Sequence, residues 1–194
     1  MKSGVRALGI AESVRGERST LAGAVVRADA VLDGLVFGSC TVGGTDATEV
    51  VCSMIDDLDR PDVRYVLLGA IAPAWYNLFD LERIHEHADR PILVVTFEAS
   101  EGLKDALRAA FSGDGLERRL ERYDRLPQRR EVSLETGETV FVRSVGVDDA
   151  EGERVVRAFT RSGGRPEPIR VARVAARAGE QYRVRFEQAG SAVE

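Results

Sequence analysis

Several features that would mark a particular class of protein are missing from this sequence. It has only two cysteines, Cys40 and Cys52, and they form no CxxC pair. We therefore expect two reduced, buried thiols rather than a disulfide or a zinc site. No apolar run approaches the roughly 20 residues that a membrane-spanning helix needs. The first four residues, Met1 to Gly4, lead into no hydrophobic signal region. We expect a cytoplasmic protein that has no membrane partner.

Several nucleotide-binding and catalytic motifs are also missing. The sequence contains no GxxxxGK[ST] phosphate loop, no GxGxxG after its first apolar run and no GxSxG elbow. Its two histidines, His85 and His87, are two positions apart in a stretch that we expect to be helical. Side chains at that spacing point about 200° apart around a helix, so they cannot share a metal ion. Glycines before a helix in "VGGTDAT" offer amides to an anion, but no lysine accompanies them.

Length and charge set the remaining limits. The chain has 194 residues, 44% of them hydrophobic, which is enough for one domain with a proper core. We expect that domain over residues 1–186 and a flexible tail over residues 187–194. The net charge is −5, so the molecule as a whole does not attract nucleic acid. A nucleic-acid site would have to be a local concentration of basic residues.

The pattern of apolar residues predicts a mixed sheet. Three short apolar runs open the chain and fit antiparallel strands; they cover residues 5–10, 21–26 and 31–37. Two nearly continuous apolar runs follow, each suited to a buried strand of a parallel unit; they cover residues 63–72 and 91–97. Helical spacing and turn residues predict the remaining elements: helices from Asp46, over 77–87, 101–111, 148–161 and 166–178, and a hairpin around Thr136-Gly137. The fold class is therefore α/β, with three antiparallel strands first and parallel units after them.

Three acids stand at the ends of predicted elements. Glu12 follows the first apolar run, Asp46 opens the first helix, and Asp80 lies in the first turn of the second. Carboxylates at strand ends can converge on one Mg²⁺ or Mn²⁺, which prefers oxygen ligands. Each acid also has a simpler explanation. Asp46 with Glu49, and Asn77 with Asp80, have the spacing of a capping box, and Glu12 can be a solvated loop residue.

Two further groups can contact a nucleic acid. Trp75 and Tyr76 lie in the loop "APAWYN", where they can stack on a displaced base or simply pack the loop. Arg170, Arg173 and Arg177 are spaced three and four apart on the last predicted helix. They form one face, which can contact phosphates or carry surface ion pairs.

These segments together resemble a known family. "LGIAES", "VGGTDAT", "VLLGAIAPAWYNLFD", "RPILVV" and "PEPIRVARVAARAG" are similar to segments of the archaeal relatives of endonuclease V, also called endonuclease dU, in the same order over residues 4–179. The resemblance implies a ribonuclease H-like fold with the first strand central and helices on both faces. It also implies a DNA-repair endonuclease that acts at deaminated or damaged bases. Glu12, Asp46 and Asp80 would hold its Mg²⁺ or Mn²⁺.

The sequence departs from this family at two places. The relatives have aspartate where Ala11 stands, and endonuclease V has another at the strand end that reads Gly69-Ala70 here. Neighbouring residues of a strand point to opposite faces, so Glu12 can replace the first of these only if the chain bulges after Ile10. Two functions stay open: a Mg²⁺- or Mn²⁺-dependent endodeoxyribonuclease with an altered site, and an inactive domain that binds nucleic acid or a protein partner.

Overall fold

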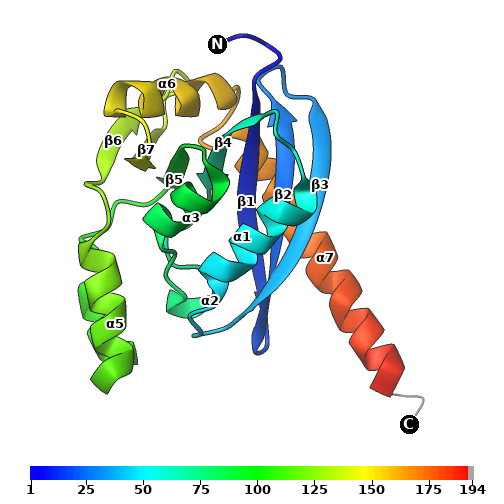
Figure 1. The fold of residues 1–194 in the computed structure, drawn as a ribbon, viewed down its shortest axis with the longest axis vertical. Coiled ribbons are helices and arrows are strands. Elements are labelled where there is room, and N and C mark those ends of the chain that lie inside the picture. Colours follow the sequence, from blue (N-terminus) through cyan, green and yellow to red (C-terminus); the bar gives the residue numbers. More distant parts are fainter. Residues whose placement is uncertain (192–194) are drawn as a thin grey trace.

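A seven-stranded sheet forms the centre of the molecule (Figure 1). The structure is a computed structural model that describes residues 1–191, with side chains described for residues 1–187. The strand order across the sheet is β3-β2-β1-β4-β5-β7-β6. In chain order the strands are β1 Arg6–Arg15, β2 Arg18–Arg27, β3 Leu32–Thr41, β4 Val63–Leu68, β5 Ile92–Thr96, β6 Arg130–Ser133 and β7 Thr139–Val145.

The pairing within the sheet is mixed. β1 and β2, and β2 and β3, are antiparallel, whereas β4 runs parallel to both β1 and β5. β7 then pairs antiparallel with β5 and with β6. The predicted order of three antiparallel strands followed by parallel units is confirmed, and so is the interior position of the first strand.

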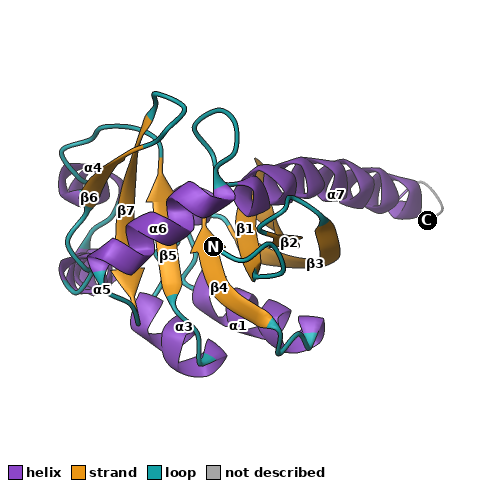
Figure 2. Ribbon diagram, turned by 90° about the horizontal axis from the view of Figure 1, so that it is seen from above, coloured by secondary structure: helices purple, strands orange, loops and turns teal. Residues whose placement is uncertain are grey.

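Helices cover both faces of the sheet (Figure 2). On one face lie α1, Ala47–Leu58, and α3, Leu81–Ala88; on the other lie α6, Asp149–Phe159, and α7, Glu167–Ser191. The short elements are α2, Pro73–Tyr76, α4, Lys104–Ala110, and α5, Gly113–Asp124. None of the described helices is long and apolar enough to cross a bilayer.

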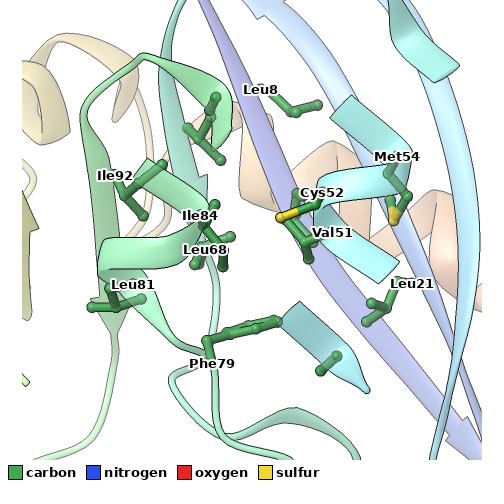
Figure 3. Packing of buried hydrophobic residues seen from close by; sticks show 14 of the residues in the cluster. Leu8, Leu21, Val51, Cys52, Met54, Leu68, Phe79, Leu81, Ile84 and Ile92 are labelled. Carbon is green, nitrogen blue, oxygen red and sulfur yellow. The ribbon is translucent and has the colours of Figure 1, made fainter. Parts of the chain in front are cut away.

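Each face of the sheet has its own apolar core. Leu8, Met54, Leu68 and Ile84 belong to the cluster beneath α1 and α3 (Figure 3). A second cluster packs beneath α6 and α7, and Phe159 is one of its fully buried members. The alternation of side chains along the interior strands therefore supplies both cores.

Helix α7 approaches β1 very closely at Gly9. A Cβ atom at Gly9 would lie 2.1 Å from the carbonyl carbon of Pro168. Only a residue without a side chain permits this contact between a helix backbone and a strand. Gly9 therefore fixes how the start of α7 lies across β1.

Strand β1 is longer than its apolar run predicted. It continues past Ile10 to Arg15 and turns into β2 through Gly16, whose φ is +65°. The extension mixes apolar and polar residues, Ala11-Glu12-Ser13-Val14-Arg15, and none of them is fully buried, which is why the apolar pattern does not reveal it. Glu12 consequently lies inside a strand, and the explanation of Glu12 as a solvated loop residue is wrong.

Two predicted helix boundaries also differ. α7 does not end at Gly179 but continues to Ser191. Gly179 lies against Phe37: a Cβ atom at position 179 would be 2.9 Å from a ring carbon of Phe37. Because glycine has no side chain, the helix packs against this ring without a clash. Residues 187–191 of the expected tail are therefore helical, and residues 192–194 lie outside the described residues. The helix expected over 77–87 begins only at Leu81 and is preceded by the separate turn α2.

Candidate functional site

A pocket opens where strand β4 ends beside β1. The β1–β4 pairing stops at Ile10 opposite Leu68, and β1 continues beyond this point paired with β2 alone. The pocket has a volume of about 370 Å³ and lies between the free edge of β1 and the first turns of α7. Its lining includes Ala11, Glu12, Gly69, Ala70, Ile169, Arg165, Arg173 and Arg177. We call this space the strand-end pocket.

Ala11 and Glu12 project to opposite faces of the sheet. The β1–β2 register runs from Arg6 to Arg15 without a shift, so no bulge follows Ile10. Ala11 packs against the clusters on the α7 side of the sheet. The condition under which Glu12 could take the place of a carboxylate at position 11 is therefore not met.

The Glu12 carboxylate is held by two hydrogen bonds on the side of the sheet away from α7. The Ser19 hydroxyl donates to its Oε2 at 2.8 Å, and the backbone N–H of Ala74 donates to the same oxygen at 2.7 Å. Hydrogen bonds to a charged group are stronger than those between neutral groups. Glu12 therefore ties the end of β1 to the turn α2.

The turn α2 has a strained backbone. Ala74, Trp75 and Tyr76 have φ values of 49°, 56° and 65°, in the left-handed region that residues with a Cβ rarely adopt. Each such residue costs on the order of 1–3 kcal/mol and persists only when its surroundings hold it. Besides Glu12, the backbone N–H of Gly43 donates to the Ala74 carbonyl at 2.6 Å, and Arg119 Nε donates to the Tyr76 carbonyl at 3.1 Å. Several contacts of the fold therefore keep this turn in place.

The strained turn presents Trp75 to solvent. The residue is 55% exposed, although its ring centroid lies 5.3 Å from that of Phe111 and 5.7 Å from that of Tyr76. It lines a second cavity of about 460 Å³, together with Tyr76, Phe97, Tyr123, Arg129 and Arg143. This aromatic cavity shares Gly69, Ala70, Arg165 and Arg173 with the strand-end pocket, so the two spaces adjoin.

Asp46 has a different role from the predicted helix cap. Its side chain makes no capping hydrogen bond in α1. Instead it accepts from the backbone N–H and the hydroxyl of Thr41, and from the amide of Asn77 at 2.7 Å. Burial alone would raise the pKa of the Asp46 carboxyl, but these hydrogen bonds outweigh it and hold the pKa below its usual value. The capping explanation of Asp46 is wrong.

Asp80 does cap a helix. It is the N-cap of α3 and accepts from the backbone N–H of Arg83 at 3.2 Å, and Arg122 Nε lies 4.0 Å from its carboxylate. The capping residue of this pair is therefore Asp80 rather than Asn77. Asp148 caps α6 in the same way, by accepting a hydrogen bond from the Glu151 N–H.

The structure does not gather the three predicted acids into one cluster. Among the described residues, no group of three or more His, Cys, Asp or Glu side chains is placed to hold a metal ion. Glu12 and Asp46 do share a neighbour. Burial raises the pKa of the buried Cys40 thiol to about 12, and the negative charges of Asp46 and Glu12 add to the rise. A role of Glu12, Asp46 and Asp80 as metal ligands stays a prediction.

The three predicted arginines separate into two groups. Arg170 forms a two-pronged ion pair with Glu167 on its own helix, at 2.5 and 2.7 Å. Arg173 and Arg177 instead line the strand-end pocket. Arg165 joins them, and no sequence pattern singles it out beyond its place just before the last helix. Its guanidinium lies 3.8 Å from the centroid of the Phe97 ring.

The side chains that line the strand-end pocket do not fit a divalent metal. Glu12 is the single carboxylate among them, against three arginines. Mg²⁺ in proteins is held by carboxylate and other oxygen ligands, and guanidinium groups supply none. At the strand end that reads Gly69-Ala70, where the resemblance to endonuclease V implies a carboxylate, position 69 is closely enclosed: a Cβ there would lie 2.9 Å from the Ile169 side chain and 3.3 Å from the Ile10 carbonyl oxygen. The pocket instead has the charge of an anion site.

The sequence is similar to a family of known proteins. It matches the model of the endonuclease dU family over residues 3–179. A relative from Pyrobaculum calidifontis, named UPF0215 protein, is 33% identical over 178 residues, which cover 90% of this chain and 97% of the relative.

The fold is similar to that of two solved structures. A protein of unknown function from Archaeoglobus fulgidus aligns with a TM-score of 0.80 at 23% identity, over 90% of this chain and 97% of the other. Endonuclease V of Ciona intestinalis, solved with a 24mer DNA that contains an inosine, aligns with a TM-score of 0.60 at 11% identity, over 92% and 87%. At these identities the likeness concerns the fold alone.

Proposed function

The chain belongs to the endonuclease dU family, and from this premise we propose that it binds nucleic acid at deaminated or damaged bases, with Trp75 stacking on the base. We take residues 1–186 as the domain that does so. Hydrolysis of the phosphodiester, which the family name implies, is slow in this member, because the strand-end pocket lacks the carboxylates expected at Ala11 and at Gly69-Ala70.

The observation that carries the proposal is the way in which Trp75 is presented. A large aromatic ring that is 55% exposed serves no core, yet three left-handed residues and the contacts from Glu12, Gly43 and Arg119 are needed to hold it there. Strained backbone that the fold maintains is typical of binding sites. An aromatic face stacks on a base of any sequence, at about 1–3 kcal/mol for each base.

The surroundings of Trp75 suit a single strand or an extruded nucleotide. The aromatic cavity adds Tyr76, Phe97 and Tyr123 as further rings, and Arg129 and Arg143 as positive charges. Rings interleaved with arginines are the usual composition of surfaces that bind single-stranded nucleic acid. The solved complex of Ciona endonuclease V with inosine-containing DNA supports nucleic acid as the ligand.

A protein that binds nucleic acid without cleaving it is the second candidate. The observation that favours it is the set of charged residues that line the strand-end pocket, three arginines and one carboxylate. The two candidates share the binding step and differ only in hydrolysis. Incubation with deoxyuridine- and deoxyinosine-containing oligonucleotides, with Mg²⁺, with Mn²⁺ and with chelator, separates them.

Binding itself has a built-in reporter, because Trp75 is the single tryptophan of the chain. We expect its fluorescence to be quenched when single-stranded oligonucleotides containing deoxyuridine or deoxyinosine are added, and less so with undamaged ones. Trp75→Ala should weaken binding about tenfold, measured by anisotropy of a labelled oligonucleotide, and Trp75→Phe should retain most of it. Tyr182→Ala is the matched control, because Tyr182 is 72% exposed and lines neither space. Equal binding by Trp75→Ala and wild type would contradict the proposal.

A further inference from the structure

We propose that the strand-end pocket holds a phosphate group of the bound nucleic acid between Arg165, Arg173 and Arg177, at the place where the family resemblance leads one to expect a metal ion. This inference rests on the proposed function, since it identifies the part of the nucleic acid that the pocket takes. It assigns to the three arginines a positioning role toward the backbone, which is separate from the role of Trp75 toward the base.

The charge of the pocket is the first argument. Three arginines and a single carboxylate, which is held on the side of the sheet away from α7, line the pocket, so the lining carries two positive charges in excess. That carboxylate, Glu12, already accepts hydrogen bonds from Ser19 and Ala74 through Oε2. An anion that enters the pocket therefore meets more positive charge than the protein itself neutralises.

The second argument is that two of the arginines have no protein partner. Within the described part of the chain, neither Arg173 nor Arg177 has a carboxylate at ion-pair distance or a hydrogen-bond acceptor. The nearest acid further along the helix, Glu180, is engaged elsewhere, by the Ser13 hydroxyl and by Arg15 at 4.0 Å. By contrast, Arg170 on the same helix is paired with Glu167.

The third argument is that the arginines are gathered in spite of their mutual repulsion. Arg173 and Arg177 lie one helical turn apart on α7, and Arg165 is held in place by stacking on Phe97. Burial lowers the pKa of Arg165, and so do the positive charges of Arg173 and Arg177, whereas the negative charge of Glu98 acts in the opposite direction. Like charges kept together at a pocket are stabilised when an anion binds between them.

The shape of the pocket also suits a phosphate. The two positions where carboxylates are expected carry small residues, and the Ala11 Cβ would lie 3.9 Å from a Cβ at Gly69. The volume of about 370 Å³ is room for roughly ten water molecules. Because the strand-end pocket adjoins the aromatic cavity, a phosphate in the first is compatible with a base on Trp75 in the second. This continuity favours a nucleic-acid phosphate over a free anion.

The test compares Arg173→Gln/Arg177→Gln with wild type and with Arg154→Gln. The control removes the same kind of charge from α6, where the Arg154 side chain is 73% exposed. Binding of a labelled single-stranded deoxyuridine oligonucleotide is measured by anisotropy in chelator at several salt concentrations, and thermal melts are recorded with and without inorganic phosphate. We expect the double variant to bind about tenfold to a hundredfold more weakly. Its salt slope should be shallower by about 0.7 for each phosphate that the arginines no longer neutralise. The control should change affinity less than about twofold.

The outcomes separate this inference from the proposed function. If the double variant and Arg154→Gln bind equally well and with the same salt slope, the phosphate site is overturned while nucleic-acid binding stands. If wild type binds no oligonucleotide but phosphate raises its melting temperature and not that of the double variant, the proposed function is overturned and only an anion site remains. The melts also report folding, and Arg165→Gln provides a second, independent variant that must weaken binding in the same direction.

Discussion

The two sides of the sheet differ at the point where β4 ends beside β1. On the side of α1, the acids Glu12 and Asp46 are present, and hydrogen bonds from the protein itself satisfy both carboxylates. On the side of α7, the carboxylates expected from the family are replaced by Ala11 and by Gly69-Ala70, and arginines line the space that they leave. The retained acids are occupied by structural contacts, and the open space is positively charged.

Acids at a strand end can serve the fold itself, as Glu12 does toward the α2 turn and Asp46 toward Thr41 and Asn77. Hydrogen bonds from backbone N–H groups stabilise the charged form of a carboxylate without any metal ion. A metal bound through Glu12 Oε2 would compete with the hydrogen bonds that hold the α2 turn. Substitutions made on one side of the sheet at a time test whether the acids serve the fold and whether the arginines bind an anion.

The largest effect is expected for Asn77→Ala, on the acid side. Asn77 is fully buried; its amide oxygen accepts from Ala47 N–H, and its NH₂ donates to Asp46 and to the Thr41 carbonyl. Removing the amide leaves these groups unsatisfied and should lower the free energy of unfolding by about 3 kcal/mol, measured by urea titration. A change below about 1 kcal/mol would show that water replaces the amide and that solvent reaches Asp46.

The second prediction contrasts two substitutions of Glu12. Glu12→Ala removes the acceptor for Ala74 and Ser19 and should destabilise the protein by about 2 kcal/mol, with a shift of Trp75 fluorescence. Glu12→Gln keeps an amide oxygen in the same place and should be destabilised less than half as much. If Glu12 acted chiefly as a metal ligand, both substitutions would abolish a Mn²⁺-dependent rise in melting temperature equally and leave the metal-free melt alike.

The third prediction concerns Ala11→Asp, on the arginine side. A carboxylate at this position faces α7, where it meets Arg165, Arg173 and Arg177 rather than Glu12. It should raise the metal-free stability by up to about 1 kcal/mol and weaken oligonucleotide binding. Ala11→Asn is the matched control for size. A stabilisation that appears only with Mn²⁺, and is absent in chelator, would favour a vestigial metal site over a phosphate site.

The smallest effect is expected in the pH dependence of stability. The Asp46 carboxyl has a pKa below its usual value in the folded protein. Its contribution to the free energy of unfolding is therefore present above the unfolded pKa of about 3.9, and it is lost as the pH falls through the lower pKa of the folded protein. Asp46→Asn should therefore show a shallower loss of stability below about pH 4 than wild type. Asp57→Asn, which removes an exposed carboxylate of α1, should keep the wild-type slope.

Apolar periodicity predicted most of the fold because most elements bury one face. The two buried parallel strands, the hairpin at Gly137 and the helix capped by Asp148 each carry a local signal and occur as predicted. The extension of β1 to Arg15 carries none, since it pairs on one side only and three of its five side chains, Glu12, Ser13 and Arg15, are polar. The continuation of α7 through Gly179 depends on packing against Phe37, which no local pattern reveals.

The candidate site could be predicted only in part, for a similar reason. Sequence spacing identified Arg173 and Arg177, which share a helix, and the family resemblance pointed to the exchanged residue at Ala11. Arg165 reaches the same pocket from outside the helix, so its role depends on tertiary structure. The partnership of Asp46 with Asn77 joins residues 31 positions apart and could not be inferred from the capping pattern, which suggested local partners instead.

The extension of β1 beyond β4 also bears on how such a protein can change over evolutionary time. From Ala11 to Arg15 the strand is held by one neighbour instead of two, so a substitution there disturbs fewer packed residues than one at Ile10. Side chains at the exposed end of this overhang, Val14 and Arg15, can therefore be exchanged, even for ones of opposite charge, with less effect on the cores than at Ile10.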